Sequence, residues 1–476
     1  MRYPSVKSIG SACRVAAILS ALSSKSKRLF PRKSWWGIGT MFAFALLGAG
    51  QVASAQGTPY EVIHDFTGSD GGYPWGSLIL SASGNLYGET ALGNKTNEKC
   101  GEDGCGTVFE LSKNPAGGWK RTVLHAFSGS DGFDPSGGLV FDGAGNLYGV
   151  TIHGGLYNAG VLFELSPGSG GGWMLTLLHN FGGPGDGASA WGRPVFDGGG
   201  NLYGTAVTGG ASGFGVVYEL SPTLTGTWNE TLIYNFTGGL DGGNPYSGLV
   251  FDGAGNLYGT TGAGGHSTVH VCKINAGCGV VFELSPNSSG GWSETVLHDF
   301  NGYDGWHSGD LIFDQTGNLY STTSNGGDFS GCASFGCGVV YELSPNADSG
   351  WTETVLHVFQ PGPQNYGGSG GSTPVGVALD AAGNLYGTTF YGANYSPGCS
   401  LGLAGCGVVF KLSPKSTGGW KETVLHTFTG SADGANPQSG VTIDPAGKLF
   451  GTGVSGPTDS ACVTLGGCGV VFEIKP

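Results

Sequence analysis

Ser247-Gly-Leu-Val-Phe-Asp-Gly-Ala-Gly-Asn-Leu-Tyr-Gly-Thr-Thr261 contains one of seven copies of the pentapeptide that decides the fold of this chain. The pentapeptide is Gly-Asn-Leu-Tyr-Gly or a close variant, and its second residues are Asn85, Asn146, Asn201, Asn256, Asn318, Asn384 and Lys448. Successive copies are 61, 55, 55, 62, 66 and 64 residues apart. Each repeat of such a length is one supersecondary unit that stacks on its neighbours, so this is a repeat protein.

One repeat contains four short apolar runs, at residues 245–252, 255–261, 279–286 and 292–300. Each run is rich in β-branched and aromatic residues and is bounded by Gly, Pro, Asn or Asp, which is typical of strands joined by tight turns. We call them strands A, B, C and D. Four antiparallel strands in about 55–65 residues match the blade of a β-propeller.

The two ends of the repeat region complete each other. Residues 60–66 read as a strand D with no A, B or C before it, and residues 471–474 read as a strand C with no D after it. We therefore predict an all-β, seven-bladed β-propeller with four antiparallel strands per blade, whose last blade is closed by the N-terminal strand. Closure of the ring leaves only short protected edges.

The first 55 residues have the features of a secretory signal peptide. They contain eight Lys or Arg and no acidic residue, then an apolar run over 35–50 and the small-x-small sequence Ala53-Ser54-Ala55. An uncleaved membrane anchor is the alternative, although the run is short for a membrane span. We predict cleavage near Ala55, a propeller over residues 56–476 with no membrane span, and a secreted or periplasmic monomer. We expect no C-terminal anchor at the ending Lys475-Pro476.

Charge excludes one class of partner. Without the eight basic residues of the leader, 12 basic residues remain against 34 acidic ones, a formal net charge of −22. This surface repels phosphate backbones, so we expect no nucleic-acid partner. Cations and neutral sugars remain compatible with it.

Ten cysteines beyond the leader form five close pairs, and all lie between strands B and C: Cys100/Cys105, Cys272/Cys278, Cys332/Cys337, Cys399/Cys406 and Cys462/Cys468. In an exported protein this even, paired pattern indicates disulfides. Pairing within each loop is the simplest arrangement, and pairing between neighbouring blades is the alternative. The loops with cysteines are longer than those without, so the bridges are expected to hold inserted segments.

The phrases Ser-Gly-Leu-Val-Phe-Asp-Gly-Ala-Gly-Asn-Leu-Tyr-Gly-Thr-Thr and Gly-Cys-Gly-Val-Val-Phe-Glu-Leu-Ser-Pro resemble the GloVer tandem repeat of bacterial "choice-of-anchor" secreted proteins. The resemblance covers residues 60–476. It implies an exported bacterial repeat protein, without an implied activity or catalytic residues. Members typically end in a sorting anchor, and the lack of one here favours a released or periplasmic protein.

Several repeated polar residues have a structural explanation. Asp at the first position of the A–B turn bonds local backbone N–H groups, and six copies carry it: Asp142, Asp197, Asp252, Asp314, Asp380 and Asp444. A histidine near the end of strand D recurs in six blades, at His64, His125, His179, His298, His357 and His426. If strand D is outermost, these rings are spread around the perimeter and form no common site. The Trp that opens strand D is interpreted as a blade-packing residue.

The candidate binding residues lie in the loops that join strand D to the next strand A. Antiparallel blades place these D–A loops on the same face as the B–C loops, and insertions on one face of a repeat array mark its binding side. Six D–A loops carry Asp-Gly, at Asp70, Asp131, Asp186, Asp241, Asp304 and Asp433, beside the aromatic residues Trp75, Trp191, Tyr246 and Trp306. We expect no cofactor. Ordinary Asp-Gly turns are the simpler explanation of these residues, and a rim of carboxylates at the central channel, which would suit Ca²⁺, is the alternative.

Three hypotheses on function follow. The first is a non-enzymatic module that binds a glycan or a cell-surface protein through the D–A/B–C face, with no catalytic residues. The second is a polysaccharide hydrolase or lyase that uses acids from different blades. The third is a purely structural envelope protein. Departures from the repeat are scattered over several blades, including Arg193 and Asp310 in place of Gly, which favours the first hypothesis over an enzyme.

Overall fold

The computed structural model describes residues 59–93, 100, 104–266, 272, 276–332, 335–348, 350–362, 368–393, 399, 405–456, 462 and 467–476. The predicted signal peptide lies outside these residues. Residues from Gly57 to Pro476 belong to one compact unit. Within the described part of the chain, no helix has the length and apolar character needed to cross a bilayer.

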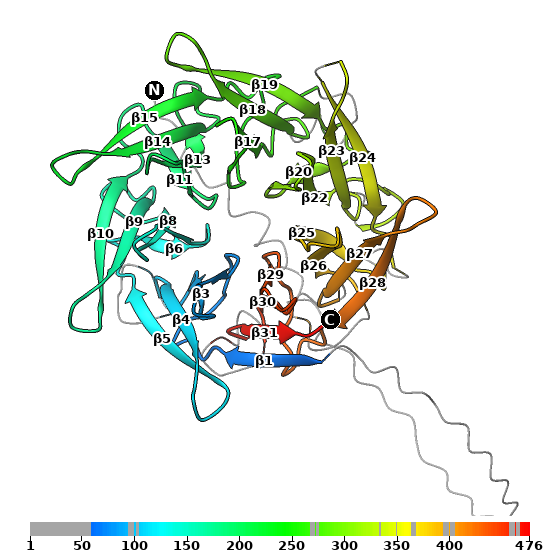
Figure 1. Cartoon of the computed structure of the whole chain (residues 1–476), viewed down its shortest axis with the longest axis horizontal. Helices are drawn as coiled ribbons and strands as arrows, with labels where there is room; N and C mark the ends of the chain where they lie inside the picture. The colour runs from blue at the N-terminus through cyan, green and yellow to red at the C-terminus, as the bar shows by residue number, and fades with distance from the viewer. Residues whose placement is uncertain are drawn as a thin grey trace, which may run out of the picture. The chain divides into compact units, whose positions relative to one another are not determined.

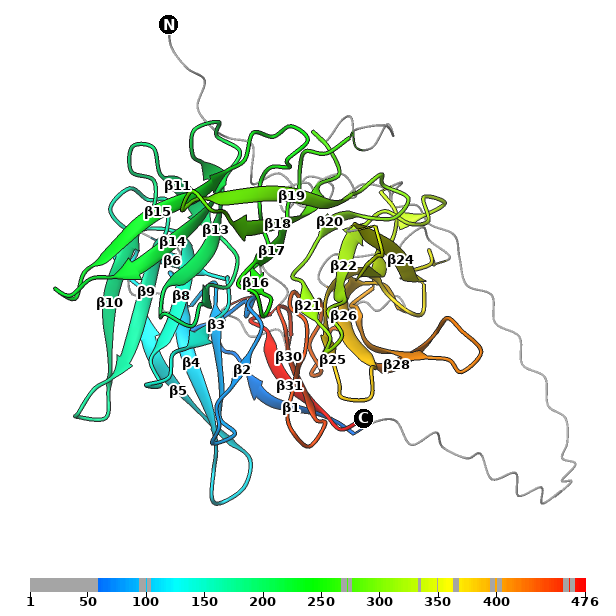
Figure 2. The same ribbon diagram turned by 45° about the horizontal axis from the view of Figure 1, so that its top comes forward.

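The regular elements are strands β1 to β31, which form seven antiparallel sheets around a central axis (Figures 1 and 2). Blade 1 consists of β2 (Ile79–Leu80), β3 (Leu86–Thr90), β4 (Thr107–Lys113) and β5 (Trp119–Ala126). Blade 2 consists of β6 (Phe133–Pro135), β7 (Val140–Phe141), β8 (Leu147–His153), β9 (Val161–Pro167) and β10 (Trp173–Asn180). Blade 3 consists of β11 (Gly187–Ala190), β12 (Val195–Phe196), β13 (Leu202–Gly209), β14 (Val216–Pro222) and β15 (Trp228–Asn235).

Blades 4 to 7 have the same order from the axis outward. Blade 4 consists of β16 (Val250–Phe251), β17 (Leu257–Thr260), β18 (Val280–Pro286) and β19 (Trp292–Asp299), and blade 5 of β20 (Trp306–Ser308), β21 (Ile312–Phe313), β22 (Leu319–Asn325), β23 (Val339–Pro345) and β24 (Trp351–Val358). Blade 6 consists of β25 (Ser372–Leu379), β26 (Leu385–Tyr391), β27 (Val408–Pro414) and β28 (Trp420–Thr427). Blade 7 consists of β29 (Thr442–Ile443), β30 (Leu449–Gly453), β31 (Val470–Ile474) and β1 (Tyr60–Asp65). The predicted seven-bladed propeller is confirmed.

The last blade is closed by the first strand of the ring. Strand β1 pairs antiparallel with β31, with Tyr60 opposite Ile474 and Asp65 opposite Val470. Figure 1 shows β1 and β31 side by side at this blade. Strand β31 thus has a partner strand on both edges, since β30 pairs with its other side.

The A–B turn explains two residues of the repeat. In blade 2, Asp142 Oδ1 accepts the N–H groups of Ala144 and Asn146 at 2.8 and 2.9 Å. Its Oδ2 accepts hydrogen bonds from the Asn146 side chain at 2.8 Å and from the Tyr148 hydroxyl at 3.2 Å. The structural interpretation of these aspartates is confirmed. The recurring pattern Asp-x-x-Gly-Asn-x-Tyr is therefore one hydrogen-bonded unit.

The remaining residues of the pentapeptide build the core. Leu147 is fully buried, and the ring of Tyr148 lies edge-on to Phe196 and Trp228 of blade 3, with centroids 5.0 and 6.4 Å apart. Sister contacts recur around the ring, so the strand D Trp is a blade-packing residue as expected. The second Gly is also required, because a Cβ atom at Gly149 would lie 2.6 Å from Phe163 Cζ.

All five predicted cysteine pairs form disulfides within their own loops, across sequence separations of 5 to 7 residues. The bridges are Cys100–Cys105, Cys272–Cys278, Cys332–Cys337, Cys399–Cys406 and Cys462–Cys468. The alternative of pairing between neighbouring blades is therefore wrong. Five disulfides fit an extracellular location.

The cysteines are more deeply buried than their place in inserted loops suggests. Cys105, Cys337 and Cys406 have no exposed surface, although loops of this length usually lie on the outside. Cys337 packs in a core cluster with Tyr320 and Phe359, and Cys406 packs in another with Tyr386 and Phe428. These cysteines thus bridge their own loops and are also part of the core between blades.

In four of the five pairs, the second cysteine also bonds the next blade through its backbone. The carbonyls of Cys337 and Cys406 accept the N–H groups of Thr373 and Asn436 at 2.9 and 2.8 Å, and both donors belong to the following D–A loop. Cys105 and Cys468 accept in the same way from Asp134 and Tyr73, at 3.2 and 2.7 Å. These disulfides therefore hold in place a backbone carbonyl that accepts a hydrogen bond from the next blade.

The glycine of the pentapeptide makes a sharp stability test. In Gly259→Ala, the new Cβ would lie 2.6 Å from Phe282 Cζ and 2.8 Å from Leu249 Cδ2. We expect a loss of about 1–3 kcal/mol in the free energy of unfolding, measured by denaturant titration under non-reducing conditions. Gly198→Ala is the matched control, because nothing lies within 4 Å of its added Cβ. Equal effects of the two substitutions would contradict this packing role.

Closure by β1 predicts the effect of shortening the chain. A chain that starts at Gly68 leaves one edge of β31 unpaired, and we expect aggregation or a melting temperature lower by more than about 10 °C. A chain that starts at Pro59 keeps β1 and serves as control. A synthetic peptide of residues 59–67 added to the shortened chain should restore part of the loss. Unchanged melting of the shortened chain would show that β1 is dispensable.

Candidate functional site

A cavity of about 530 Å³ lies on the axis of the ring. All seven blades line it, through the innermost strand or the residues just before that strand. Most lining positions carry Gly, Ser or an aliphatic residue, because the inner strands lie closest together. Aromatic or charged side chains at these positions are therefore exceptions to the repeat.

Three of the predicted aromatic residues meet at this cavity. Trp75, Trp191 and Tyr246 come from blades 1, 3 and 4, and all three line it. The rings of Trp75 and Trp191 are 5.6 Å apart, those of Trp191 and Tyr246 are 5.7 Å apart, and both pairs are edge-to-face. Blade 2 carries Ser136 at the equivalent position, which leaves room for the two tryptophans to meet. We call the three aromatic residues the aromatic cluster.

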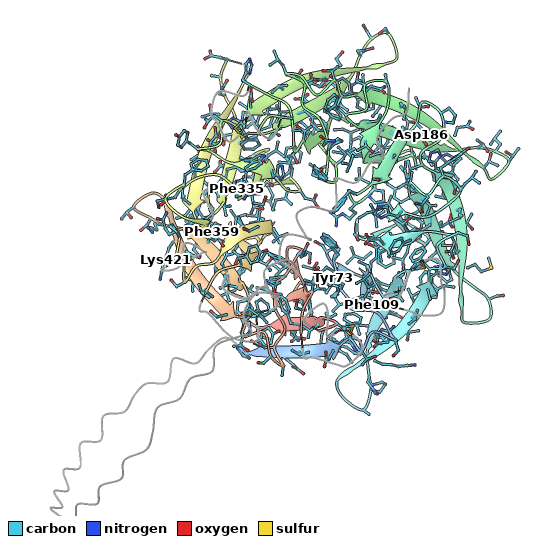
Figure 3. The ribbon with its side chains drawn as sticks, turned by 180° about the vertical axis from the view of Figure 1, so that it is seen from behind. Tyr73, Phe109, Asp186, Phe335, Phe359 and Lys421 are labelled. Carbon is cyan, nitrogen blue, oxygen red and sulfur yellow. A yellow bond between two sulfur atoms is a disulfide. The ribbon has the colours of Figure 1, made fainter. Side chains whose placement is uncertain are left out.

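The aromatic cluster remains accessible to a ligand. Trp75 and Trp191 are half-buried, and Tyr246 is 37% exposed. Tyr73, which packs at 5.9 Å from Trp75, lies beside the central opening in Figure 3. The cluster thus offers aromatic ring surface at the cavity on the D–A/B–C face.

Trp306, the fourth predicted aromatic residue, does not join the cluster. It is only 6% exposed and belongs to a core cluster that includes Cys272 and Cys278. Its burial does not fit the predicted role of an exposed aromatic residue in the binding surface.

The reason is its place in the loop. Each D–A loop contains one non-glycine residue with a positive φ, such as Asn244 at 53° and His307 at 56°. Tyr246 follows this residue by two positions, whereas Trp306 precedes it by one. Trp306 is therefore equivalent to Gly243, and its side chain packs into the core rather than toward the cavity.

The six D–A aspartates do not form a rim at the channel, and none of them lines the cavity. Five form a hydrogen bond with the histidine or tyrosine of their own strand D: His64–Asp70 at 3.0 Å, His125–Asp131 at 3.1 Å, His179–Asp186 at 3.0 Å, Tyr234–Asp241 at 3.2 Å and His426–Asp433 at 3.2 Å. The sixth, Asp304, lies at ion-pair distance, 3.3 Å from His298 Nε2. The outermost strand therefore holds each acid near the perimeter, as Figure 3 shows for Asp186.

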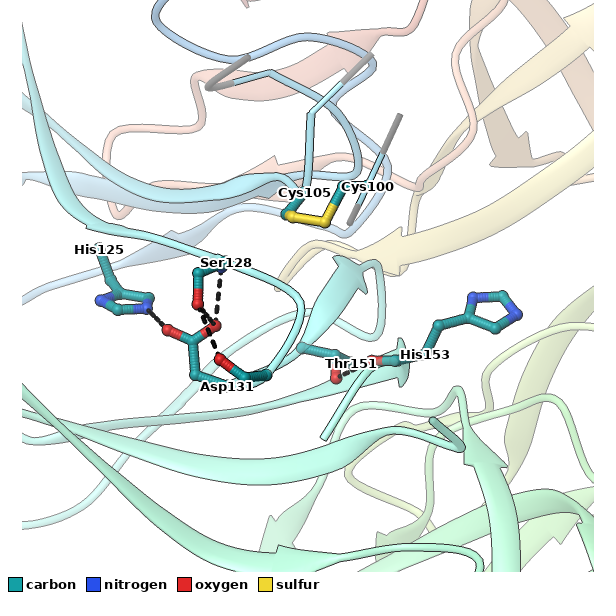
Figure 4. Close-up of a disulfide and its surroundings, with 8 residues drawn as sticks. Cys100, Cys105, His125, Ser128, Asp131, Thr151 and His153 are labelled. Carbon is teal, nitrogen blue, oxygen red and sulfur yellow. Dashed lines mark hydrogen bonds and ion pairs between the residues drawn. A yellow bond between two sulfur atoms is a disulfide. The ribbon is translucent and has the colours of Figure 1, made fainter. Parts of the chain in front are cut away.

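These aspartates also cap the start of the D–A loop. Figure 4 shows Asp131 accepting the backbone N–H of Ser128 at 2.7 Å and its hydroxyl at 2.8 Å, beside His125. With its oxygens occupied in this way, the acid acts as a turn residue. The expected Ca²⁺ rim is not assembled, because Ca²⁺ takes six to eight oxygen ligands and these acids lie in separate blades.

A third residue completes each of these junctions between blades. It lies on strand D of the next blade, four residues before that strand's own His or Tyr, and it differs around the ring: Arg121, Leu175, Glu230, Glu294, Glu353, Glu422 and Tyr60. Arg121 pairs with Asp70 at 3.3 Å, whereas Tyr60 stacks on His426 at 3.7 Å. We call these seven arrangements the blade junctions.

Two blade junctions bring three possible metal ligands together. The ligand atoms of His179, Asp186 and Glu230 lie within 4.8 Å of one another, and so do those of His298, Asp304 and Glu353. The donor set of one imidazole and two carboxylates suits a transition metal better than Ca²⁺. Sister junctions contain Arg, Leu or Tyr instead of Glu and keep the same backbone arrangement, so blade packing alone accounts for it.

Burial changes the acidity of the junction carboxyls. Burial raises the pKa of Glu230, Glu294 and Glu353 to about 7, and neighbouring aspartates add to the shift. Burial would also raise the pKa of Asp70, but the hydrogen bonds from His64 and Thr67 and the charge of Arg121 outweigh it and lower that pKa to about 2.

Two charged residues line the cavity itself, Arg193 on blade 3 and Asp310 on blade 5. Both stand where sister blades carry small residues, and both are exposed. Asp310 Oδ1 accepts the N–H of Gly248 at 2.8 Å. The sequence shows that both residues depart from the repeat, but it does not show that both line the same cavity.

Glu89 was missed by the reasoning from sequence. It replaces a hydroxyl or aliphatic residue of strand B and is only 1% exposed. Its Oε2 accepts the N–H of Gly138 at 2.8 Å, and burial raises its pKa to about 8. The sequence does contain a signal for Glu89, because blade 1 has Leu-Tyr-Gly-Glu-Thr where blades 4 and 6 have Leu-Tyr-Gly-Thr-Thr. The residue lies behind the cavity wall rather than in the lining.

Comparison with known proteins identifies the repeat and the fold. The family model described as the Gloeobacter/Verrucomicrobia repeat matches residues 37–171, 95–272, 170–362 and 269–476. No curated protein matches the sequence. Three similar solved structures share 10–13% identity with the chain, a likeness that concerns the fold alone.

One similar structure is the extracellular domain of a protein assigned as a hybrid two-component system from B. thetaiotaomicron, with 10% identity, a TM-score of 0.51 and coverage of 88% of this chain and 42% of that one. Another is an ancestral GH74 enzyme, with 13% identity, a TM-score of 0.51 and coverage of 86% and 48%. The chain thus spans less than half the length of these two proteins. A gluconolactonase from Xanthomonas campestris shares 12% identity with a TM-score of 0.39, over 88% and 90%.

The junction glutamates predict how stability depends on pH. Their folded pKa of about 7 lies above the ordinary value of 4.5, so their contribution is complete below about pH 4.5 and is lost as pH rises through 7. We expect the melting temperature to fall between pH 5 and pH 8. In Glu230→Gln/Glu294→Gln/Glu353→Gln this fall should be smaller by at least about 2 °C, measured by calorimetry.

Glu61→Gln, on the exposed part of β1, is the control and should keep the fall of the unmodified protein. The same fall in the triple variant would mean that other groups carry the pH dependence.

Proposed function

The chain belongs to the Gloeobacter/Verrucomicrobia repeat family, and from this premise we propose that it is a non-enzymatic glycan-binding propeller that acts outside the cytoplasm. The binding surface is the D–A/B–C face around the mouth of the central cavity. The observation that carries the proposal is the aromatic cluster, in which three blades contribute one ring each to a single accessible place. Aromatic rings present an apolar face to the C–H groups of a sugar, while nearby polar groups bond its hydroxyls.

The distribution of exposed apolar residues supports this choice of face. Among the described residues, twelve large hydrophobic side chains are exposed, and seven of them belong to D–A or B–C loops: Leu156, Tyr157, Phe214, Leu240, Tyr246, Tyr303 and Phe335. Surfaces that gather apolar side chains amid polar ones mark interaction sites. The longer, disulfide-bonded B–C loops lie on the same face.

The lining of the cavity favours binding over hydrolysis. Glycosidases use two carboxyl groups about 5–9.5 Å apart on either side of the scissile bond. Among the described residues that line the cavity, Asp310 is the one acid, and its Oδ1 already bonds Gly248. Glu89 is buried behind the wall. A hydrolase or lyase therefore remains the second candidate, distinguished by release of reducing ends.

The test is binding of residues 56–476, expressed with intact disulfides, to a glycan array and then to individual hits by calorimetry. We expect Trp75→Ala and Trp191→Ala each to weaken binding about tenfold or more, because each removes one stacking surface. Trp191→Phe should retain part of the affinity. Tyr303→Ala removes a ring that is 65% exposed on the same face but does not line the cavity, and it should bind normally.

Each variant is first checked for an unchanged melting temperature. Saturable binding without sugar release supports the module, whereas release of reducing ends supports the enzyme. If no glycan on the array binds, the glycan proposal is overturned. Binding of a cell-surface protein would then favour a protein partner, and binding of neither would favour a structural role.

A further inference from the structure

Arginine is rare in this protein. After the predicted leader the chain has only two, Arg121 and Arg193. Arg121 is engaged in a blade junction, where its guanidinium pairs with the Asp70 carboxylate at 3.3 Å and also donates to the Asp70 carbonyl. Its role is thus to join two blades. Arg193 stands elsewhere, at the cavity.

Arg193 projects from the cavity wall between β11 and β12 and is exposed. The ion pairs of Arg and Lys among the described residues are Arg121 with Asp70, and Lys448 and Lys475 with Glu473. Arg193 takes part in none of them. A guanidinium without an ion-pair partner, inside the cavity of an otherwise acidic protein, attracts anions to that place.

The side chain of Arg193 reaches toward blades 1 and 2. A Cβ atom built on Gly138 would lie 3.7 Å from Arg193 Cδ and 3.8 Å from the backbone nitrogen of Ser77. Asp310 lies on the other side of Arg193, because its carboxylate accepts the N–H of Gly248 of blade 4, and a Cβ atom built on Gly248 would lie 3.6 Å from Arg193 Cβ. The Arg193 guanidinium therefore extends over the part of the cavity wall formed by blade 2, which lies between the blades that carry Trp75 and Trp191.

Arg193 and Trp191 are two residues apart on a short segment before β12, and both line the cavity together with Trp75. A guanidinium binds carboxylate or sulfate oxygens through two parallel hydrogen bonds, which a small or apolar residue at this position cannot do. One ligand can thus stack a sugar ring on the aromatic cluster and place an anionic group on Arg193.

We propose that the cavity recognises an acidic sugar, one whose carboxylate or sulfate binds Arg193 while its ring packs against Trp75 and Trp191. This inference rests on the proposed glycan binding and names the class of glycan. The mature chain has a formal net charge of −22, so a densely charged polyanion would be repelled. The ligand is therefore a largely neutral oligosaccharide with isolated anionic residues.

The experiment compares matched ligands on the whole protein of residues 56–476. The ligands are an oligosaccharide with one uronic acid, the same oligosaccharide with its carboxyl group reduced to an alcohol, and a singly sulfated form of the reduced oligosaccharide. Affinities are measured by calorimetry at about 0.15 M salt, where distant surface charges are screened.

The variants separate the guanidinium from the overall charge. Arg193→Ser copies Ser77 of blade 1, and Arg193→Lys keeps the charge without the planar pair of donors. Lys120→Gln removes one exposed charge on β5 and serves as control.

We expect the unmodified protein and Lys120→Gln to bind an anionic form at least about tenfold more tightly than the reduced form, as a paired guanidinium allows. Arg193→Ser should abolish this preference and change the affinity for the reduced form less than about twofold, and Arg193→Lys should retain part of it. Preference for the uronic acid or for the sulfate decides which anion is recognised, and either supports the inference.

Equal binding of all forms by the unmodified protein, or an anion preference that survives Arg193→Ser, would overturn the inference and leave glycan binding standing. Failure of every oligosaccharide, the reduced form included, would overturn both proposals.

Discussion

Burial of one blade against the next is the interaction on which the rest of this structure depends. In blades 1 to 4 the ring of the strand B Tyr packs on the strand A Phe and the strand D Trp of the following blade, as Tyr148 does with Phe196 and Trp228. A single blade leaves these surfaces exposed to water, and a row of blades leaves two such faces uncovered. Closure into a ring covers both, and β1 seals the last blade.

This constraint divides the residues of each blade into two groups. Strands B and C are almost wholly buried in every blade, so they tolerate little change. The inner strand A and the loop before it contribute to the cavity wall and are freer to vary. Five aromatic or charged departures from the repeat occupy such positions: Trp75, Trp191, Arg193, Tyr246 and Asp310. The cavity can therefore be specialised without disturbing the packing between blades.

The polar residues near the perimeter serve the opposite purpose. The His–Asp pairs and the third residue of each blade junction join strand D, the D–A loop and the next strand D. Because the third residue can be Arg, Leu, Glu or Tyr, the junction tolerates changes of charge while the backbone stays the same. Raised pKa values at Glu230 and Glu353 follow from this burial, since carboxyl groups are placed beside other acids where packing requires them.

Sequence alone determined the number of blades, the closing strand and the A–B turn and indicated the five cysteine pairs, because each follows from local periodicity that is repeated along the chain. Asn146 next to Asp142, or Cys337 five residues after Cys332, carries its own structural signal. Tertiary structure decided what lies across the ring. Nothing in the spacing of Trp75, Trp191 and Tyr246 shows that their rings meet, nor that Trp306 and Cys406 are buried or the D–A aspartates bonded to histidines. These facts depend on the rotation from one blade to the next and on one-residue differences within loops, which set the direction of a side chain but leave no periodic signal.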